Sequence, residues 1–164
     1  VTTPRDLIDE QEVKLMFYLL ADCVALRLRE QGLQGRLVSI WVRDNTLRCV
    51  TRQHKSHRFT DLSSEIAQQA MALFRAHYHW EHPVRSLGVS VGEFEQAAGA
   101  PVQLDLFADV RQRERLEALE QATDRLKRRF GSASVQRAVL LTDPALASSR
   151  SYEEQPFHPT SFFH

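Results

Sequence analysis

The sequence contains little cysteine and no long hydrophobic run. Its two cysteines, Cys23 and Cys49, lie in apolar patterns without CxxC spacing, so we expect buried thiols in a reducing cytoplasm and neither a disulfide nor a metal pair. No apolar run approaches the ~18 residues of a membrane span, and no signal peptide is visible. The chain starts at Val1 and not at methionine, from which we expect a piece of a longer protein.

Catalytic patterns are also missing. The sequence shows no Ser-His-Asp set, no Gly-rich phosphate loop and no carboxylate pair flanked by strand signals. The segment from His77 to His82 holds three histidines, but it sits where a helix is ending, so its side chains should diverge and a zinc site is not expected. The composition therefore favours a binding protein with no catalytic residues and no metal.

Charge is balanced overall and uneven locally. The 164 residues carry 21 basic and 21 acidic side chains, and their number fits one ordinary domain with a tail. Between residues 36 and 58 the only acid is Asp44, against six basic residues: Arg36, Arg43, Arg48, Arg52, Lys55 and Arg58. A local excess of this kind attracts anions whatever the total charge.

Residues 36–52 are predicted to form a β-hairpin around the turn pair Asp44-Asn45. Such a turn sets Val42 opposite Leu47 and Ile40 opposite Cys49. With side chains alternating at period two, one face of the hairpin is apolar: Val38, Ile40, Val42, Leu47 and Cys49. The other face is cationic with one large aromatic: Ser39, Trp41, Arg43, Thr46, Arg48, Val50 and Arg52.

The remaining pattern gives an α+β fold in the order β-α-β-β-α-β, with a four-stranded antiparallel sheet and two helices on one of its faces. The first strand covers residues 2–7 and should lie at a sheet edge because it contains Pro4. A helix follows over residues 9–31, then the hairpin and a polar segment over residues 53–61. The second helix starts with Ser63 or Ser64 as its N-cap and ends before Pro83, and the last strand covers residues 84–94.

We divide the chain into a domain at residues 1–95, a linker at 96–107, a helix at 108–131 and a tail at 132–164 that should be flexible. The helix has one narrow apolar seam: Leu116, Leu119, Thr123, Leu126 and Phe130. Within the linker, Gln103-Leu-Asp-Leu-Phe107 carries three large apolar residues outside any periodic element. Such a peptide either fills a partner's pocket or folds back on the core.

Two interpretations of the cationic sheet face stay open. Arginines at the roughly 6–7 Å spacing of alternate strand residues suit a nucleic-acid backbone. Nearby hydroxyls can add bonds to phosphate: those of Thr2, Thr3, Ser39, Ser86 and Ser90. Alternatively, the face is simply solvated.

The sequence resembles the C-terminal part of a Y-family translesion DNA polymerase of the bacterial DNA polymerase IV, or ImpB/MucB/SamB, type. The resemblance runs through residues 2–7, 35–45 and 83–89 and continues into the linker peptide. It implies that residues 1–95 are the little-finger domain, whose sheet holds the backbone of primer–template DNA. It also implies that Gln103-Leu-Asp-Leu-Phe107 binds the β sliding clamp, with Gln103 at the pocket rim and Leu104, Leu106 and Phe107 in apolar clefts beside Asp105.

From the face and the resemblance together, the candidate DNA contacts are Thr3, Arg5, Arg43, Arg48, Arg52, Arg85 and Ser86. The resemblance further implies a cytoplasmic role in lesion bypass, DNA repair and the SOS response. The polymerase (transferase) activity and its Mg²⁺ would belong to a palm domain outside this sequence, so the chain alone should not be an enzyme. Two rivals remain: an RNA-binding module of ferredoxin-like topology, whose central strands would carry stacking aromatics, and a small enzyme on that scaffold.

Overall fold

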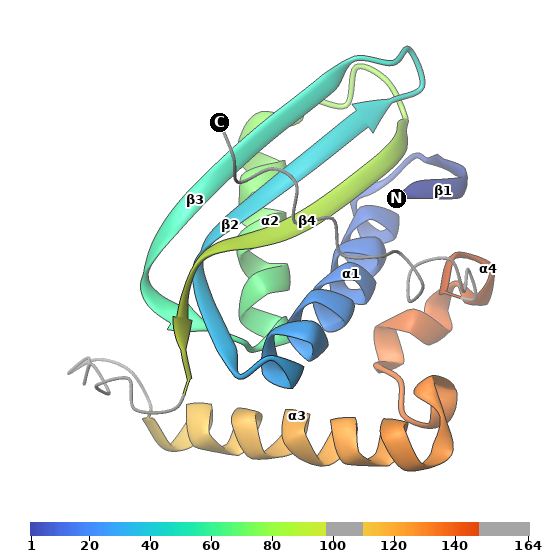
Figure 1. Cartoon of the computed structure of the whole chain (residues 1–164). Helices are drawn as coiled ribbons and strands as arrows, with labels where there is room; N and C mark the ends of the chain where they lie inside the picture. The colour runs from blue at the N-terminus through green and yellow to red at the C-terminus, as the bar shows by residue number, and fades with distance from the viewer. Residues whose placement is uncertain (98–109, 148–164) are drawn as a thin grey trace.

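The computed structural model describes residues 1–97 and 110–147 (Figure 1). Its elements are β1 (Thr2–Leu7), α1 (Glu10–Glu30), β2 (Leu33–Asp44), β3 (Cys49–Thr60), α2 (Ser63–His77), β4 (Val84–Gln96), α3 (Val110–Phe130) and α4 (Pro144–Ala147). Short 3₁₀ helices at Ser132–Ser134 and Ala138–Thr142 connect α3 to α4. The predicted β-α-β-β-α-β order and the α+β fold class are confirmed.

The four strands form one antiparallel sheet in the order β1-β4-β2-β3. β2 lies inside the sheet and pairs with β4 along most of its length, from Leu33 opposite Gln96 to Asp44 opposite Val84. β1 lies at one edge, as Pro4 predicted. Helices α1 and α2 cover the same face of this sheet, while no described helix covers the other face (Figure 1). We call the uncovered side the open face.

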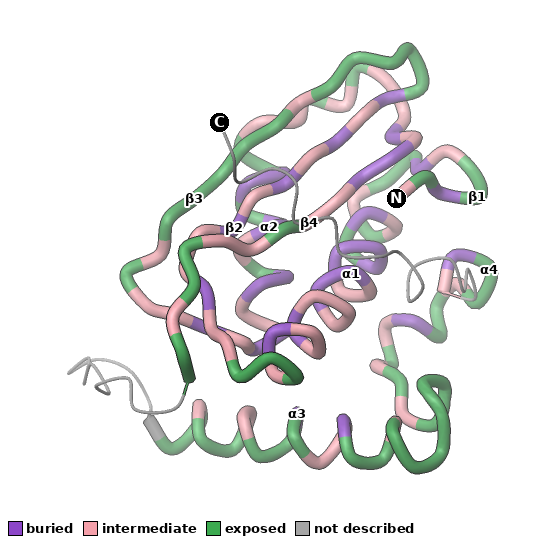
Figure 2. The backbone as a smooth tube through the Cα atoms, in the orientation of Figure 1, coloured by how far each residue is buried: buried purple, intermediate pink, exposed green. Residues whose placement is uncertain are grey.

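The main core lies between the sheet and the two helices. Val38, Ile40 and Val42 of β2 are at most 1% exposed, and burial of each contributes about 1.5–3 kcal/mol. Beneath them, the rings of Phe17 and Phe74 meet edge-on with their centroids 6.0 Å apart. Figure 2 shows the buried positions of α1 and α2 turned towards the sheet, whereas most of β3 is exposed. The period-two burial of β2 therefore decides which side chains reach the open face.

The hairpin is present, but its predicted register is wrong. Val42 pairs with Val50 and not with Leu47, a difference of three positions. Because three is an odd number, the two faces of β3 are exchanged relative to the prediction. Arg52 therefore lies on the helix-facing side of the sheet, and Cys49, expected to be buried, lies exposed on the open face.

The side chain of Asp44 explains this shift, because it organises a longer turn than the predicted one. Its Oδ1 accepts hydrogen bonds from the N–H (2.8 Å) and hydroxyl (2.8 Å) of Thr46 and from the N–H of Arg48 (3.0 Å). Leu47 takes the left-handed φ of 71° that closes the turn. Burial alone would raise the pKa of Asp44, but the bonds from Thr46 and Arg48 lower it below its ordinary value.

The segment predicted to be polar and irregular, residues 53–61, is instead the second half of β3, which continues to Thr60. This half of the strand lacks the alternation of apolar residues because most of its side chains are exposed at the sheet edge. The backbone of β2 supplies its hydrogen-bonding partner, with Leu37 opposite Lys55 and Gly35 opposite Thr60. Charged side chains on such an edge also discourage pairing with other chains.

Helix α3 docks on the domain chiefly through charged residues, while only Leu116 and Thr123 of its apolar seam are half-buried. Glu120 and Asp124 are 7% and 8% exposed, whereas Leu119, Leu126 and Phe130 are 60%, 44% and 62% exposed. Arg29 of α1 binds both acids, with its Nε 2.7 Å from the carboxylate of Asp124. Burial would lower the pKa of Arg29, but the bond to Asp124 and the charge of Glu120 raise it overall. The arginine therefore stays charged between its partners.

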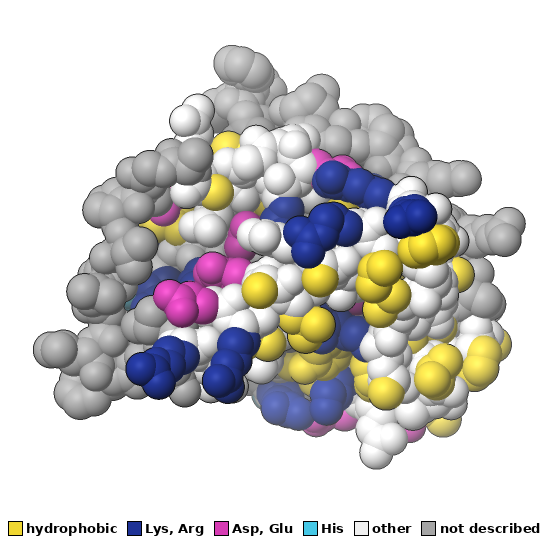
Figure 3. All heavy atoms as spheres, turned by 90° about the horizontal axis from the view of Figure 1, so that it is seen from below, with side chains coloured by type: hydrophobic (Ala, Val, Ile, Leu, Met, Phe, Trp, Pro, Cys, Tyr) yellow, Lys and Arg dark blue, Asp and Glu magenta, His cyan; other side chains and the backbone are white. Residues whose placement is uncertain are grey.

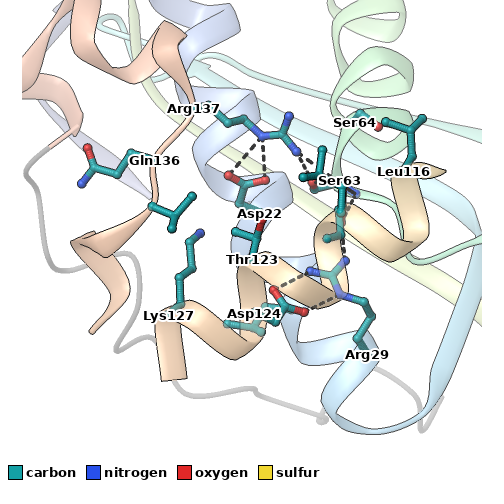
Figure 4. Close-up of a pocket in the computed structure, with 14 residues that line it drawn as sticks. Asp22, Arg29, Ser63, Ser64, Leu116, Thr123, Asp124, Lys127, Gln136 and Arg137 are labelled. Atoms are coloured by element: carbon teal, nitrogen blue, oxygen red, sulfur yellow. Dashed lines mark hydrogen bonds and ion pairs between the residues drawn. The ribbon is translucent and has the colours of Figure 1, made fainter. Parts of the chain in front are cut away.

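Glu120 also binds the start of α2. Its carboxylate accepts hydrogen bonds from the N–H (3.0 Å) and hydroxyl (2.6 Å) of Ser63, where the helix dipole favours negative charge. Ser63 is thus the first residue of α2 and not its predicted N-cap, a position that Leu62 occupies. Arg137 approaches from beyond α3 and donates to Asp22 (3.0 Å) and to the hydroxyl of Ser63 (2.5 Å), as Figure 4 shows.

We call these six residues the docking cluster: Asp22, Arg29, Ser63, Glu120, Asp124 and Arg137. They line a hollow of about 220 Å³ between α1, α2 and α3 (Figure 4).

The tail predicted to be flexible from residue 132 is packed against the domain in its first part, residues 132–147. Residues 132–147 follow α3 back onto the domain, where Leu140 and Leu146 are 5% and 0% exposed in the main core. Leu140 lies in the short apolar run Ala138-Val-Leu-Leu141 and Leu146 between two alanines, and neither belongs to a helical or strand period that would have revealed its burial. Residues 98–109 and 148–164 lie outside the described part of the chain, and with them most of the predicted linker and the rest of the predicted tail.

We expect Asp44→Asn to remove a source of acid sensitivity. Because the pKa of Asp44 is lowered in the folded chain, the stability gained from its charged form is present above the unfolded pKa, about 3.9, and is lost as the pH falls through the folded pKa. The stability difference between wild type and variant, measured by urea unfolding, should be constant near neutral pH and shrink below about pH 4. A difference that grows in acid would contradict this account of the turn.

We expect Glu120→Ala to release α3. The change leaves buried partners without their carboxylate, a loss that typically costs about 3–5 kcal/mol. Amide hydrogen exchange should accelerate along α3 while α1 keeps its protection. Glu114→Ala is the matched control, since Glu114 is an exposed acid on the same helix. Equal exchange in α3 for both variants would show that the cluster does not hold the helix.

Candidate nucleic-acid interface

The open face is built from cross-strand rows, since residues directly opposite in antiparallel strands share a face. β2 contributes Leu37, Ser39, Trp41 and Arg43. Opposite them on β4 lie Gly92, Ser90, Gly88 and Ser86, and on β3 lie Lys55, Gln53, Thr51 and Cys49. Every β4 position in these rows is glycine or serine. Ser86 is fully buried, and the side chains of Trp41 and Leu37 pack beside Gly88 and Gly92, so Ser90 is the exposed β4 residue of these rows.

Arg43 is the central charge of the open face. Its Nη2 donates a hydrogen bond to Ser86 Oγ (3.1 Å), and its guanidinium carbon lies 5.5 Å from the ring centroid of Trp41. Ser86 Oγ in turn lies 3.1 Å from Thr2 Oγ1, so the row continues across β4 to β1. Among the described residues Arg43 has no carboxylate partner, and its Nε is buried without a hydrogen-bond acceptor. Ser86 is fully buried and so holds Arg43 in place, whereas the half-buried guanidinium of Arg43 and the exposed hydroxyl of Thr2 can meet an anion.

The opposite end of the open face is electrically neutralised. Glu93 binds both Lys55 and Arg36 at 2.8 Å. The bonds from Lys55 and Arg36 lower the pKa of Glu93. The excess of positive charge seen between residues 36 and 58 is therefore partly cancelled by an acid from a distant part of the sequence. Sequence reasoning missed Glu93 because only the β2–β4 pairing brings it there.

The structure brings together only some of the predicted DNA contacts. Arg43 and Ser86 meet on the open face. Thr3 is 2% exposed and donates its hydroxyl to the carbonyl oxygens of Arg5 (2.7 Å) and Arg85 (2.9 Å). Its neighbour Thr2 supplies the open-face hydroxyl instead. Of the two threonine hydroxyls predicted for this surface, the pairing of β1 with β4 therefore places Thr2 on the open face, opposite Ser86, and buries Thr3.

The predicted contacts other than Arg43, Ser86 and Thr3 are arginines away from this row. Three of them bind acids of the chain itself: Arg5 binds Glu12 and Asp143, Arg48 binds Glu81 and Arg85 binds Asp6. Arg52 lies on the other side of the sheet, as described above. Exposed pairs of this kind contribute only about 0–1 kcal/mol. A phosphate could therefore replace the carboxylate of such a pair at little cost.

The predicted clamp-binding residues Gln103, Leu104, Asp105, Leu106 and Phe107 lie outside the described part of the chain. Within the part described, no group of three or more histidine, cysteine or acidic side chains could hold a metal ion. None of the described helices is both long and apolar enough to span a membrane.

Comparison with known proteins places the chain in a family. The model of the impB/mucB/samB family C-terminal domain matches residues 1–106. A DNA polymerase IV of Acetivibrio thermocellus is 38% identical over 146 residues, which cover 89% of this chain and 36% of the relative. A DNA polymerase IV of Pelotomaculum thermopropionicum is 33% identical over 153 residues, covering 93% of this chain and 37% of the relative. The chain thus spans little more than a third of these relatives' length.

Proposed function

The chain belongs to the impB/mucB/samB C-terminal domain family of Y-family DNA polymerases, and on this premise we propose that it holds primer–template DNA and docks its polymerase on the β sliding clamp during lesion bypass. In this proposal the open face binds the DNA backbone, and Gln103-Leu-Asp-Leu-Phe107 binds the clamp. Polymerisation and its Mg²⁺ belong to a palm domain elsewhere in the parent protein, which works in the cytoplasm as part of the SOS response.

The observation that carries the DNA proposal is Arg43, a guanidinium that two features prepare for phosphate. Ser86 and Trp41 hold it in place, and no described carboxylate neutralises it. Guanidinium binds phosphate oxygens through paired N–H groups. Contacts of this kind read the backbone and not the base sequence, so they also accept a template with a damaged base.

The glycine and serine positions of β4 support the same proposal. Gly88, Ser90 and Gly92 carry no side chain or a small one, and Trp41 and Leu37 pack beside the two glycines, so no large side chain of β4 would keep a sugar–phosphate strand away from the sheet. Arg48 and Arg85 stand near the ends of the same strands, where DNA could draw them from Glu81 and Asp6. We therefore keep both among the proposed contacts and place Arg43 first.

The RNA-binding alternative fits the open face less well. A module of that kind stacks two or three bases on aromatic side chains of its central strands. Trp41 is the one aromatic in the open-face rows of β2 and β4, and its ring lies next to the guanidinium of Arg43. A titration that compares single-stranded RNA with duplex DNA separates the two functions, and tighter binding of RNA would favour the alternative.

We expect Arg43→Gln to weaken duplex binding by a similar factor on unrelated sequences and to reduce the slope of log K against log salt by about 1. Fluorescence anisotropy over a range of salt concentrations measures both. Arg75→Gln is the control, because Arg75 is exposed on α2 and binds Glu10, on the helix side of the sheet. If the two variants lost the same affinity, bulk charge and not the open face would explain binding.

We expect Leu106→Ala combined with Phe107→Ala to weaken clamp binding by at least about 2 kcal/mol, since both would be buried anchors. Surface plasmon resonance with immobilised β clamp measures the loss. Glu114→Ala, a change in an exposed residue of α3, serves as the control. Unchanged binding by the double variant would reject the clamp contact and leave the DNA proposal intact.

A further inference from the structure

Most of the acidic side chains of helix α3 are either buried or ion-paired. Its acids are Glu114, Glu117, Glu120 and Asp124, and its basic residues are Arg111, Arg113, Arg115, Arg125, Lys127, Arg128 and Arg129. The docking cluster buries Glu120 and Asp124 against the domain, and Arg113 binds Glu117 at 3.0 Å. Glu114 is therefore the one acid of α3 that is both exposed and outside the ion pairs found in the described structure.

Four arginines lie together on the side of α3 turned away from the domain. At 3.6 residues per turn, positions four, fourteen and eighteen residues after Arg111 fall within about 40° of it around the helix. We call this set the arginine stripe: Arg111, Arg115, Arg125 and Arg129. All four are exposed, and none has a carboxylate partner among the residues that the structure describes. Figure 3, which views the molecule from the side of α3, shows more basic than acidic side chains on this surface.

We propose that the arginine stripe is a second surface for the phosphate backbone of duplex DNA. The inference rests on the proposed function, which makes DNA the ligand, and adds a site outside the sheet. The stripe offers more unpaired guanidinium groups than the open-face rows, where Arg43 is the one arginine. Exposed guanidinium groups without a carboxylate partner can bind phosphate through two parallel N–H groups.

The spacing within the stripe fits the ligand. Arg111 and Arg115 form one pair and Arg125 and Arg129 the other, with the pair centres about 21 Å apart along the helix axis. Ala118 lies between the pairs on the same side of the helix. The facing members, Arg115 and Arg125, are about 15 Å apart, which is comparable with the width of the DNA major groove, about 12 Å. The two pairs can therefore contact the backbones that flank one groove, while the small side chain leaves the groove unfilled.

The docking cluster sets both the position of the arginine stripe and the charge around it. It fixes α3 to α1 and α2 by buried ion pairs, so the arginines stand at a set position relative to the sheet. It also takes Glu120 and Asp124 out of the helix surface, where they would cancel the field of the arginines. One set of contacts therefore both positions and charges the proposed surface.

The test is the full chain carrying Arg125→Gln and Arg129→Gln, with duplex DNA as the probe. Neither arginine takes part in the docking cluster, so the fold should be unaffected, which circular dichroism checks. We expect several-fold weaker binding and a salt slope reduced by about 2, one unit for each arginine. The matched control, Lys14→Gln with Arg75→Gln, removes two exposed charges from α1 and α2 and should leave the slope unchanged.

Comparison with Arg43→Gln separates the two claims. If Arg43→Gln weakens binding and the α3 variant behaves like its control, the second surface is rejected and the open face stands. If the α3 variant weakens binding and Arg43→Gln does not, the stripe stands and the open-face proposal fails. If both behave like the control, both are rejected.

Discussion

The alternation of side chains along β2 is the constraint on which the molecule depends. Val38, Ile40 and Val42 are buried under α1 and α2, and this burial obliges Ser39, Trp41 and Arg43 to lie on the uncovered side. A slip of one residue in the register would send the arginine into the core and three apolar side chains into water. The same packing that stabilises the fold thereby presents a fixed cationic surface.

Helix α3 is held on the domain chiefly by charge, whereas the segment after it is anchored by Leu140 and Leu146 in the main core. Helix α3 leaves Leu119 and Phe130 exposed and docks through Glu120 and Asp124 against Arg29. A buried ion pair costs much of its attraction in desolvation, so its value lies as much in fixing one arrangement as in stability. The arrangement it fixes turns the acids inward and the arginines outward.

The element order was predictable because the helices and β2 carry clear periods in the sequence. The hairpin register was not, since it depends on three hydrogen bonds to one side chain of Asp44. Arg43 and Ser86 were both predicted as contacts of one site, and the hydroxyl of Thr2 was predicted beside them, whereas Glu93 emerges only from strand pairing. The docking of α3 could not be derived from the sequence, because it depends on charged contacts whose partners lie about 90 residues away in sequence.

The central claim, that duplex DNA lies on the open face, can be tested by measuring how fast the native thiol of Cys49 reacts with and without DNA. Cys49 is exposed on this face directly opposite Arg43, whereas Cys23 lies on α1. The rate of maleimide modification of Cys49 should fall several-fold when saturating duplex DNA is present, with little change at Cys23. An unchanged rate at Cys49, under conditions where anisotropy shows the DNA to be bound, would place the DNA elsewhere and contradict the account.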